Sequence, residues 1–114
     1  MKTRNGFVSN SSSTAFIIKN RTKERKTLVD FVRENPRLIE MFREEYGHTE
    51  NDGYTQDALI ESASARNMAF EAKEKKYCPF GDEDGDLVGE VFDYILRGGG
   101  ESPSFAWRFE EWLR

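Results

Sequence analysis

The sequence predicts a single α+β domain in which a short antiparallel sheet, formed by the N- and C-terminal segments, packs against about four helices. The chain has 114 residues, which is the length of one ordinary domain. A β-branched, apolar run near the N-terminus and alternating aromatic residues near the C-terminus indicate strands. Between them, apolar residues recur at helical spacing and are interrupted by Gly, Pro and Asn. We therefore expect one domain over residues 1–114, with a basic N-terminal loop and strand in 1–26 and an acidic, mainly helical body with a C-terminal strand in 27–114.

Two strands are expected to pair with each other. The first is the apolar run Ala15–Lys19. The second covers Phe105–Glu110, where aromatic residues occupy every second position. A helix also fits this second segment, and it would align Phe105, Phe109, Trp112 and Leu113 on one face. We favour the strand, because the first strand would otherwise have no evident partner.

The aromatic residues of the C-terminal segment have two interpretations. Large aromatic side chains usually fill protein cores, so we expect Trp107 and Trp112 to close the core. The alternative is an exposed anchor for a partner, since Trp, Tyr and Arg dominate the binding energy of many interfaces.

The first two helices are expected on either side of a proline. Thr27 is a typical N-cap, and we expect Asp30 to favour the helix dipole rather than to complete a capping box, because its side chain is short. Asn35-Pro36 interrupts the helical pattern, and the proline suits the first turn of a second helix. That second helix is expected to reach Tyr46, with Gly47 as its C-terminal stop.

Two further helices are expected in the second half of the chain. Thr55 is the expected cap of a third helix that runs to about Lys76 and carries many small residues. The segment Cys78-Pro79-Phe80-Gly81 and the acidic run after it are expected to break this helix. The fourth helix, Leu87–Arg97, has the clearest amphipathic pattern, with Asp86 as its N-cap and with Phe92 and Ile95 expected in the core.

The charged residues are divided unequally along the chain. Residues 1–26 contain seven Lys or Arg and one Glu, whereas residues 27–114 contain ten Lys or Arg and twenty Asp or Glu. The net charges are therefore +6 and −10, and the whole chain carries −4. An acidic body can attract a basic protein surface, although the basic segment could instead lie on the acidic body of the same chain. The acids that we expect to face a partner are Glu40, Glu44, Glu45, Asp82 and Asp84.

The N-terminal segment contains a distinctive polar tract between apolar flanks. It reads R-N-G-F-V-S-N-S-S-S-T from Arg4 to Thr14 and is followed by Phe16-Ile17-Ile18. This pattern resembles the N-terminal signature of small, uncharacterised proteins of tailed bacteriophages and prophages, with Thr14-Ala15 standing where further serine is usual. The resemblance implies a phage-type accessory protein in the cytoplasm of a bacterial host, and it supplies no catalytic residue. The apolar flanks lead us to expect an ordered, anchored loop.

The same tract has a possible ligand. Successive backbone N–H groups and hydroxyls can hold a phosphate, so Ser9, Ser11, Ser12 and Ser13 are candidate phosphate-binding residues. The alternative is a structural turn, because Ser and Asn side chains commonly satisfy the backbone of tight turns. The tract lacks the G-x-x-x-x-G-K-[ST] pattern of a nucleotide-binding loop.

Cysteine and histidine counts disfavour several kinds of chemistry. The single Cys78 excludes an internal disulfide, and together with the single His48 it supplies too few ligands for a zinc site. A nucleophile–base pair of these two residues would have no marked third residue to orient it. We therefore expect no catalytic residue and no cofactor.

Calcium and membrane insertion are also disfavoured. Asp82, Asp84 and Asp86 match the first positions of a calcium loop, but Leu87 stands where that loop requires glycine, so no metal site is expected. No apolar run approaches the ~20 residues of a membrane-spanning helix. Residues 1–6 lack the apolar stretch of a secretory signal, which favours the cytoplasm.

These observations lead to one functional hypothesis and two alternatives. The leading hypothesis is a non-catalytic accessory protein that binds a host or phage protein, such as a nucleic-acid-handling enzyme, through an acidic face. Direct binding of nucleic acid is not expected, because the cations of residues 19–26 form no established motif. The alternatives are a virion or assembly component, and a phosphate- or nucleotide-binding protein that uses residues 9–14. The oligomeric state is left open.

Overall fold

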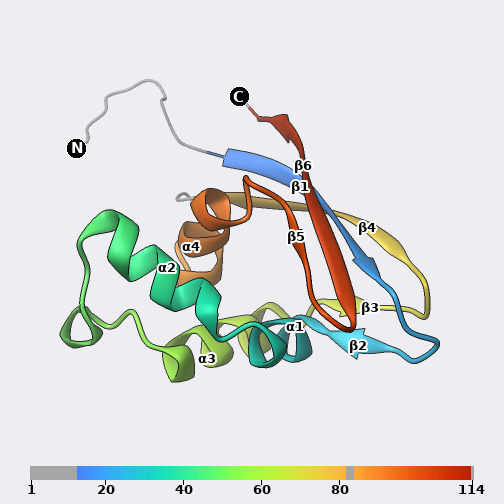
Figure 1. Cartoon of the computed structure of the whole chain (residues 1–114), viewed down its shortest axis with the longest axis horizontal. Coiled ribbons are helices and arrows are strands. Elements are labelled where there is room, and N and C mark those ends of the chain that lie inside the picture. The colour runs from blue at the N-terminus through green and yellow to red at the C-terminus, as the bar shows by residue number, and fades with distance from the viewer. Residues whose placement is uncertain (1–12, 82–83, 114) are drawn as a thin grey trace.

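Strands from opposite ends of the chain lie side by side in the centre of an antiparallel sheet (Figure 1). The protein is described from a computed structural model, which describes residues 13–81 and 84–113. The elements in chain order are β1 (Ser13–Asn20), β2 (Lys26–Thr27), α1 (Leu28–Glu34), α2 (Arg37–Tyr46), the 3-10 helix η1 (Glu50–Asp52), α3 (Gln56–Arg66), β3 (Ala69–Phe70), β4 (Lys75–Gly81), α4 (Leu87–Ile95), β5 (Gly100–Glu101) and β6 (Phe105–Trp112).

The main sheet has the strand order β4-β1-β6-β5, and a second, two-stranded sheet joins β2 to β3. In the central pair, Ile18 lies opposite Trp107 and Asn20 opposite Phe105. The register shifts by a bulge between Ala15 and Phe16. The predicted α+β class, the four helices and the pairing of the two terminal strands are confirmed, and β4 and β5 extend the sheet beyond the prediction.

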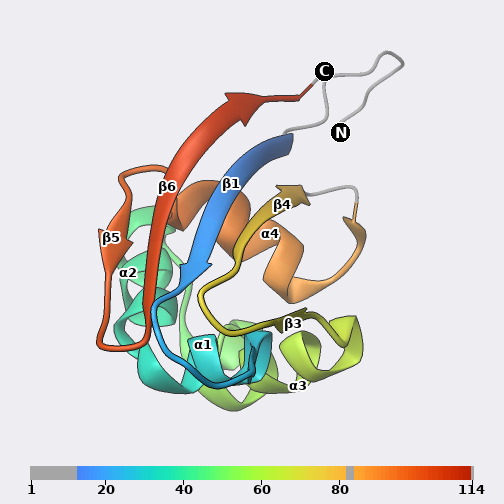
Figure 2. The ribbon, with the colours of Figure 1, turned by 90° about the vertical axis from the view of Figure 1, so that its right-hand side faces the viewer.

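One face of the sheet is covered by helices, and the other is open as far as residues 13–81 and 84–113 are concerned (Figure 2). Phe16 and Ile18 of β1 are fully buried, as are Phe80 of β4 and Phe105 of β6. Side chains of a strand point alternately to its two faces, so these residues share the helix-covered face. Tyr77, which precedes the buried Cys78 in β4, is 47% exposed on the open face.

Aromatic rings meet edge to face at the centre of the core. The ring of Phe31 lies 5.5 Å from that of Phe92 and 5.1 Å from those of both Phe105 and Trp107, with interplanar angles above 80°. Phe92 also meets Phe80 at 5.3 Å. Such contacts add about 0.5–1.5 kcal/mol each beyond area burial. These contacts therefore join α1 and α4 to the strands β4 and β6 of the main sheet.

The start of α1 corrects one expectation. Thr27 is the N-cap, as predicted, and its hydroxyl accepts a hydrogen bond from the Asp30 N–H at 3.2 Å. Asp30 also accepts the Thr27 N–H at 2.8 Å, so the short carboxylate does complete a capping box. Pro36 and Gly47 flank α2 as expected, and Gly47 takes the left-handed conformation that ends the helix.

The expected third helix is only half as long as predicted. It ends at Arg66, because Asn67 adopts a left-handed conformation and returns its N–H to the Ser64 carbonyl. The following residues form β3 and β4 instead of a further helix and its break. Pro79 lies within β4, where it is tolerated because β4 is an edge strand. The strand pairing overrides local helix propensity here.

The fourth helix agrees closely with its prediction. Asp86 caps it and accepts the Gly89 N–H at 2.9 Å, and the helix ends at Ile95, two residues before the expected end. Phe92 is fully buried, whereas Ile95 is only partly buried against the core. Among the described residues, no helix is both long and apolar enough to cross a membrane.

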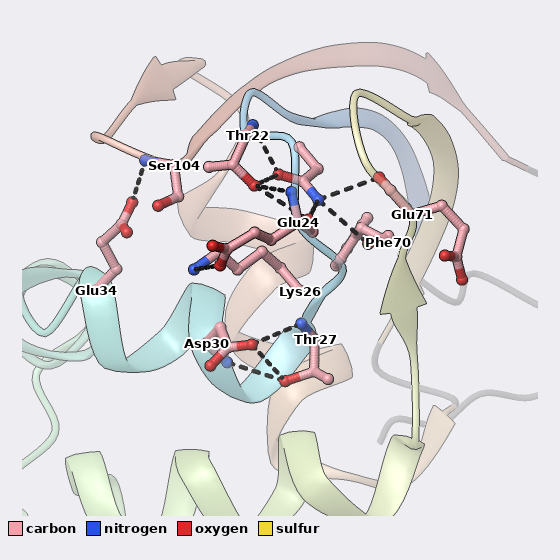
Figure 3. Close-up of polar contacts among 10 residues, drawn as sticks. Thr22, Glu24, Lys26, Thr27, Asp30, Glu34, Phe70, Glu71 and Ser104 are labelled. Atoms are coloured by element: carbon pink, nitrogen blue, oxygen red, sulfur yellow. Dashed lines mark hydrogen bonds and ion pairs between the residues drawn. The ribbon is translucent and has the colours of Figure 1, made fainter.

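A buried asparagine joins the end of β1 to the strand connections. The amide Nδ2 of Asn20 donates to the carbonyl oxygens of Glu24 at 2.7 Å, Phe70 at 3.2 Å and Glu71 at 3.1 Å. Its Oδ1 accepts from the Thr22 N–H at 2.9 Å and from the Thr22 hydroxyl at 2.7 Å. Figure 3 shows these contacts beside the capping box of α1. The connector after β1 is therefore held by one side chain.

Candidate functional site

The exposed side of α2 carries three acids around an exposed methionine. Glu40, Glu44 and Glu45 are all exposed, and no ion pair to any of them is found within the described parts of the chain. Met41 lies on the same helix and is 39% exposed. Helical periodicity explains this arrangement, because Leu38, Ile39 and Phe42 occupy the buried side. The sequence-predicted acids of α2 therefore share a solvent-facing helix.

The acidic loop before α4 is engaged by an arginine. Arg66 donates from Nε to Asp86 at 2.7 Å and from Nη2 to both Asp84 and Asp86. Asp84 also accepts the Gly81 N–H at 3.0 Å. Asp84, which we expected to face a partner, is exposed but paired with Arg66, and Asp82 lies outside the described residues. The loop contributes less free negative charge than its composition suggests.

The same ion pairs explain two pKa shifts. Burial alone would raise the pKa of Asp86, but the hydrogen bonds from Arg66 and from the Gly89 N–H bring it below its usual range. The hydrogen bond with Asp86 is the main cause of the raised pKa of Arg66. Both groups therefore stay charged at neutral pH, and their pairing fastens α3 to the start of α4.

The basic N-terminal part lies in part on the acidic body. Arg21 is 3.1 Å from Glu101, and Arg25 is 3.2 Å from Glu71. Both pairs are exposed, so each contributes at most about 1 kcal/mol. The self-complementary interpretation of the charge division thus holds for two of the cations.

Most of the serine tract falls outside the described residues. This applies to Ser9, Ser11 and Ser12, so both their order and their binding of phosphate stay predictions. Ser13 begins β1, and its carbonyl accepts the Leu113 N–H at 3.0 Å. The backbone of Ser13 is therefore part of the pairing between the first and last strands.

A buried carboxylate joins β1 to α4. Asp93 is fully buried, and its Oδ1 accepts from the Thr14 hydroxyl at 2.8 Å and from Arg97 Nη2 at 3.1 Å. Its Oδ2 is buried without a hydrogen-bond partner among the described residues. Sequence reasoning missed this group, although Asp93 and Arg97 have the i, i+4 spacing of a helical ion pair. Its visible contacts are those of a structural clamp.

An arginine lies between two aromatic rings next to this clamp. The Arg97 guanidinium is 4.6 Å from the centre of the Tyr94 ring and 4.4 Å from that of Trp112. The ring of Tyr46 continues the row at 5.2 Å from Tyr94. Trp107 is buried as expected, but Trp112 is 56% exposed, so the core-closing expectation is wrong for the second tryptophan. Burial, followed by the charge of Glu45, raises the pKa of Tyr46.

The cysteine and the histidine contact different parts of the fold. Cys78 is buried in β4, and burial raises the pKa of its thiol to about 12. The His48 ring packs against those of Phe42 and Tyr54, at centroid distances of 5.6 Å and 4.2 Å. A thiol of this pKa holds almost no thiolate at neutral pH, so the arrangement does not favour a nucleophile at Cys78.

The acids of the acidic loop do not assemble with other ligands. Over residues 13–81 and 84–113, no three His, Cys, Asp or Glu side chains are grouped so that they could hold a metal ion. Asp84 and Asp86 use their oxygens for Arg66 and for backbone N–H groups.

Comparison with known proteins adds no relative. No protein-family model, no curated protein and no solved structure matches the chain.

Proposed function

We propose that this chain is a non-catalytic accessory protein, of the kind found in tailed phages and prophages, that binds a basic protein surface through the exposed side of α2. The observation that carries the proposal is the grouping of Glu40, Glu44 and Glu45 around the exposed Met41. In the loop before α4, Asp84 and Asp86 share the single positive charge of Arg66. We therefore assign the binding surface to α2, whose three acids form no ion pair within residues 13–81 and 84–113.

The exposed methionine distinguishes α2 from the other helices. Asp57 and Glu61 of α3 are also exposed acids, but the large exposed apolar side chains of the described residues are Met41, Tyr46, Tyr77 and Trp112, none of them on α3. Interfaces are enriched in Met and aromatic residues at their centre and carry their charges at the rim. Met41 with its acidic neighbours has this composition.

The acids are expected to act mainly on the rate of association. Charges at the rim of an interface attract a partner over the ~8–10 Å that salt leaves unscreened at physiological ionic strength. Reversal of Glu40 and Glu44 should therefore slow association more than it speeds dissociation. The association rate of the wild type should fall as the salt concentration rises.

A capture experiment with a matched control tests the proposal. The tagged chain is incubated with lysate of phage-infected bacteria as the wild type, as Glu40→Lys/Glu44→Lys and as Asp57→Lys/Glu61→Lys. Each double variant reverses one acid in the first turn of a helix and the acid four residues later. We expect wild type and the α3 variant to retain the same protein, and the α2 variant to lose it. Equal retention by all three would contradict the proposal.

Kinetic measurements then distinguish a loss of electrostatic attraction between the partners from a loss of folding in the variant. Circular dichroism confirms that each variant is folded, and surface plasmon resonance with the captured protein gives both rate constants at two salt concentrations. An association rate that responds neither to salt nor to charge reversal on α2 would also contradict the proposal.

A further inference from the structure

Two segments that are far apart in the sequence form a basic end of the molecule. Residues 19–26 link β1 to β2, and residues 71–76 link β3 to β4, at the right-hand end in Figure 1, whereas α2 lies towards the left. The Thr22 carbonyl accepts the Lys73 N–H at 3.0 Å, which holds the two segments together. They contain eight Lys or Arg and three Asp or Glu, so this basic end carries a net charge of +5 in a chain whose total is −4.

The acids of the basic end are all paired, whereas four of its lysines are not. Ion pairs join each of its acids to one of its cations: Glu24 to Lys26, Glu71 to Arg25 and Glu74 to Lys76. Arg21 pairs with Glu101 of β5. The cations to which no ion pair is found within the described parts of the chain are Lys19, Lys23, Lys73 and Lys75. Their four positive charges are therefore available to an anion.

Two of these lysines lie side by side on the open face of the main sheet. Lys19 of β1 is directly opposite Lys75 of β4. Lys19 stands between the buried Ile18 and Asn20, so its side chain points to the open face. Like charges at directly opposite positions of a sheet repel each other and reduce its stability. A bound phosphate would relieve this repulsion.

An exposed aromatic ring lies next to this pair. Tyr77 follows Lys75 by two residues on the same face of β4 and is 47% exposed. Its hydroxyl donates a hydrogen bond to Glu111 of β6, so the side chain crosses the intervening strand β1. This contact holds the ring over the open face. Proteins that bind single-stranded nucleic acids combine cations, which contact the phosphates, with aromatic rings on which the bases stack.

We infer that the basic end binds single-stranded nucleic acid, with one base stacked on Tyr77 and the neighbouring phosphates at Lys19 and Lys75. The unpaired lysines select a polyanion, and the exposed ring selects a polyanion that carries unpaired bases. The acids of β5 and β6 leave this preference intact, because each has a partner: Arg21 for Glu101, Arg108 for Glu110 and Tyr77 for Glu111. Residues 19–26 form no nucleic-acid motif by themselves, but the fold adds the cations of residues 71–76 and the ring of Tyr77.

The test uses the full chain and two strands of equal charge. Fluorescence anisotropy follows the binding of a labelled twelve-nucleotide oligothymidylate and of a strand of the same length that consists of abasic sites. We expect the oligothymidylate to bind with a Kd below about 100 μM at about 50 mM salt. The abasic strand should bind at least about fivefold more weakly, because it has no base to stack. Equal binding of the two strands, or no binding of the oligothymidylate, would overturn the inference.

Salt dependence and a matched pair of variants locate the phosphates. Each phosphate neutralised on a single strand contributes about −0.7 to the slope of log K against log salt concentration, so Lys19→Gln/Lys75→Gln should flatten the slope by about 1.4. The control, Arg33→Gln/Arg37→Gln, removes two exposed cations of α1 and α2 to which no ion pair is found among the described residues. It should leave the slope unchanged and the Kd within about twofold of wild type. Equal effects of the two variants would overturn the inference.

Two variants of Tyr77 test the stacking. Tyr77→Ala should weaken the oligothymidylate at least about fivefold and leave the abasic strand unchanged, whereas Tyr77→Phe keeps the ring and should stay within about threefold of wild type. Circular dichroism confirms that each variant is folded. Unchanged binding of the oligothymidylate by Tyr77→Ala, or an equal loss with both strands, would overturn the inference.

The inference goes beyond the proposed function and does not rest on it, because none of the four unpaired lysines lies on α2. Capture of a partner that is insensitive to charge reversal on α2 would contradict the proposed function alone. Absence of oligothymidylate binding would contradict this inference alone.

Discussion

Replacement of Asn20 by Asp is a sharp test of the connector after β1, because the two side chains have the same shape. In the wild type, the Asn20 Nδ2 faces three carbonyl oxygens at 2.7–3.2 Å, and the whole residue is buried. Asn20→Asp at neutral pH replaces this donor by a negatively charged oxygen that faces the same three acceptors. The Oδ1 contacts with Thr22 can persist, so the change falls mainly on the donor side.

The expected loss of stability follows from the number of contacts. Asn20→Ala removes five hydrogen bonds, of which only the one to Phe70 O is wholly buried, and should cost about 2–4 kcal/mol. Asn20→Asp keeps two of the five but adds repulsion between a buried carboxylate and three carbonyls. We expect it to cost about 3–5 kcal/mol at pH 7.

The dependence on pH separates the two variants. A buried carboxyl that faces acceptors favours its neutral form, so in Asn20→Asp its folded pKa should exceed the ordinary ~3.9. The protonated form regains one donor, and the deficit relative to wild type should therefore shrink as the pH falls from 7 towards 4. The deficit of Asn20→Ala should stay constant. Urea denaturation at both pH values, with wild type measured in parallel, gives the comparison, and a deficit of Asn20→Asp below about 1 kcal/mol at pH 7 would refute the reasoning.

Three further predictions concern the core, the cysteine and the acidic loop. Phe92→Ala should cost about 3–5 kcal/mol in urea denaturation, whereas Ile95→Ala should cost about 1–2 kcal/mol because its side chain is only partly buried; equal losses would contradict this. Iodoacetamide at pH 8 should modify Cys78 only after unfolding, since burial raises its pKa to about 12, and mass spectrometry would reveal modification of the native chain. Arg66→Met should destabilise the fold at pH 7 but hardly near about pH 2, because a carboxyl with a lowered pKa, Asp86, stabilises above its unfolded pKa and loses this effect as the pH falls through its folded pKa. A pH-independent loss would show that packing, and not this ion pair, is what Arg66 supplies.

The elements that the sequence predicts well are those defined by local signals. In α4, the apolar spacing and the Asp86 cap lie within one segment, and both its start and its buried Phe92 are as predicted. The break at Pro36 and the stop at Gly47 are equally local. By contrast, β4 is a strand because it pairs with β1, a strand that lies far from it in the sequence. The alternation of buried Cys78 and Phe80 with exposed residues covers only a few positions of β4. Pro79 also makes this segment look unlike a strand in the sequence.

In the candidate site, too, some features follow from local sequence and others from tertiary structure. The exposure of Glu40 and Glu44 follows from helical periodicity, so it is readable in the sequence. The ion pair between Asp84 and Arg66 depends on how α3 packs against α4, and no local sequence pattern predicts that packing. A hollow of about 280 Å³ between α2 and β5 is also a product of tertiary structure, because its lining combines residues of α2, α4 and β6 with Gly99 and Gly100.

The central position of β1 and β6 has a consequence for biosynthesis. The contacts that complete the sheet join residues far apart in the chain, such as Ile18 and Trp107. Non-local pairings of this kind slow folding, because a long loop must close before they form. Until Phe105–Trp112 has left the ribosome, β1, which carries Phe16 and Ile18, cannot pair with its neighbour β6. The sheet is therefore expected to form only after Phe105–Trp112 has left the ribosome, with the apolar edge of β1 available to chaperones in the interval.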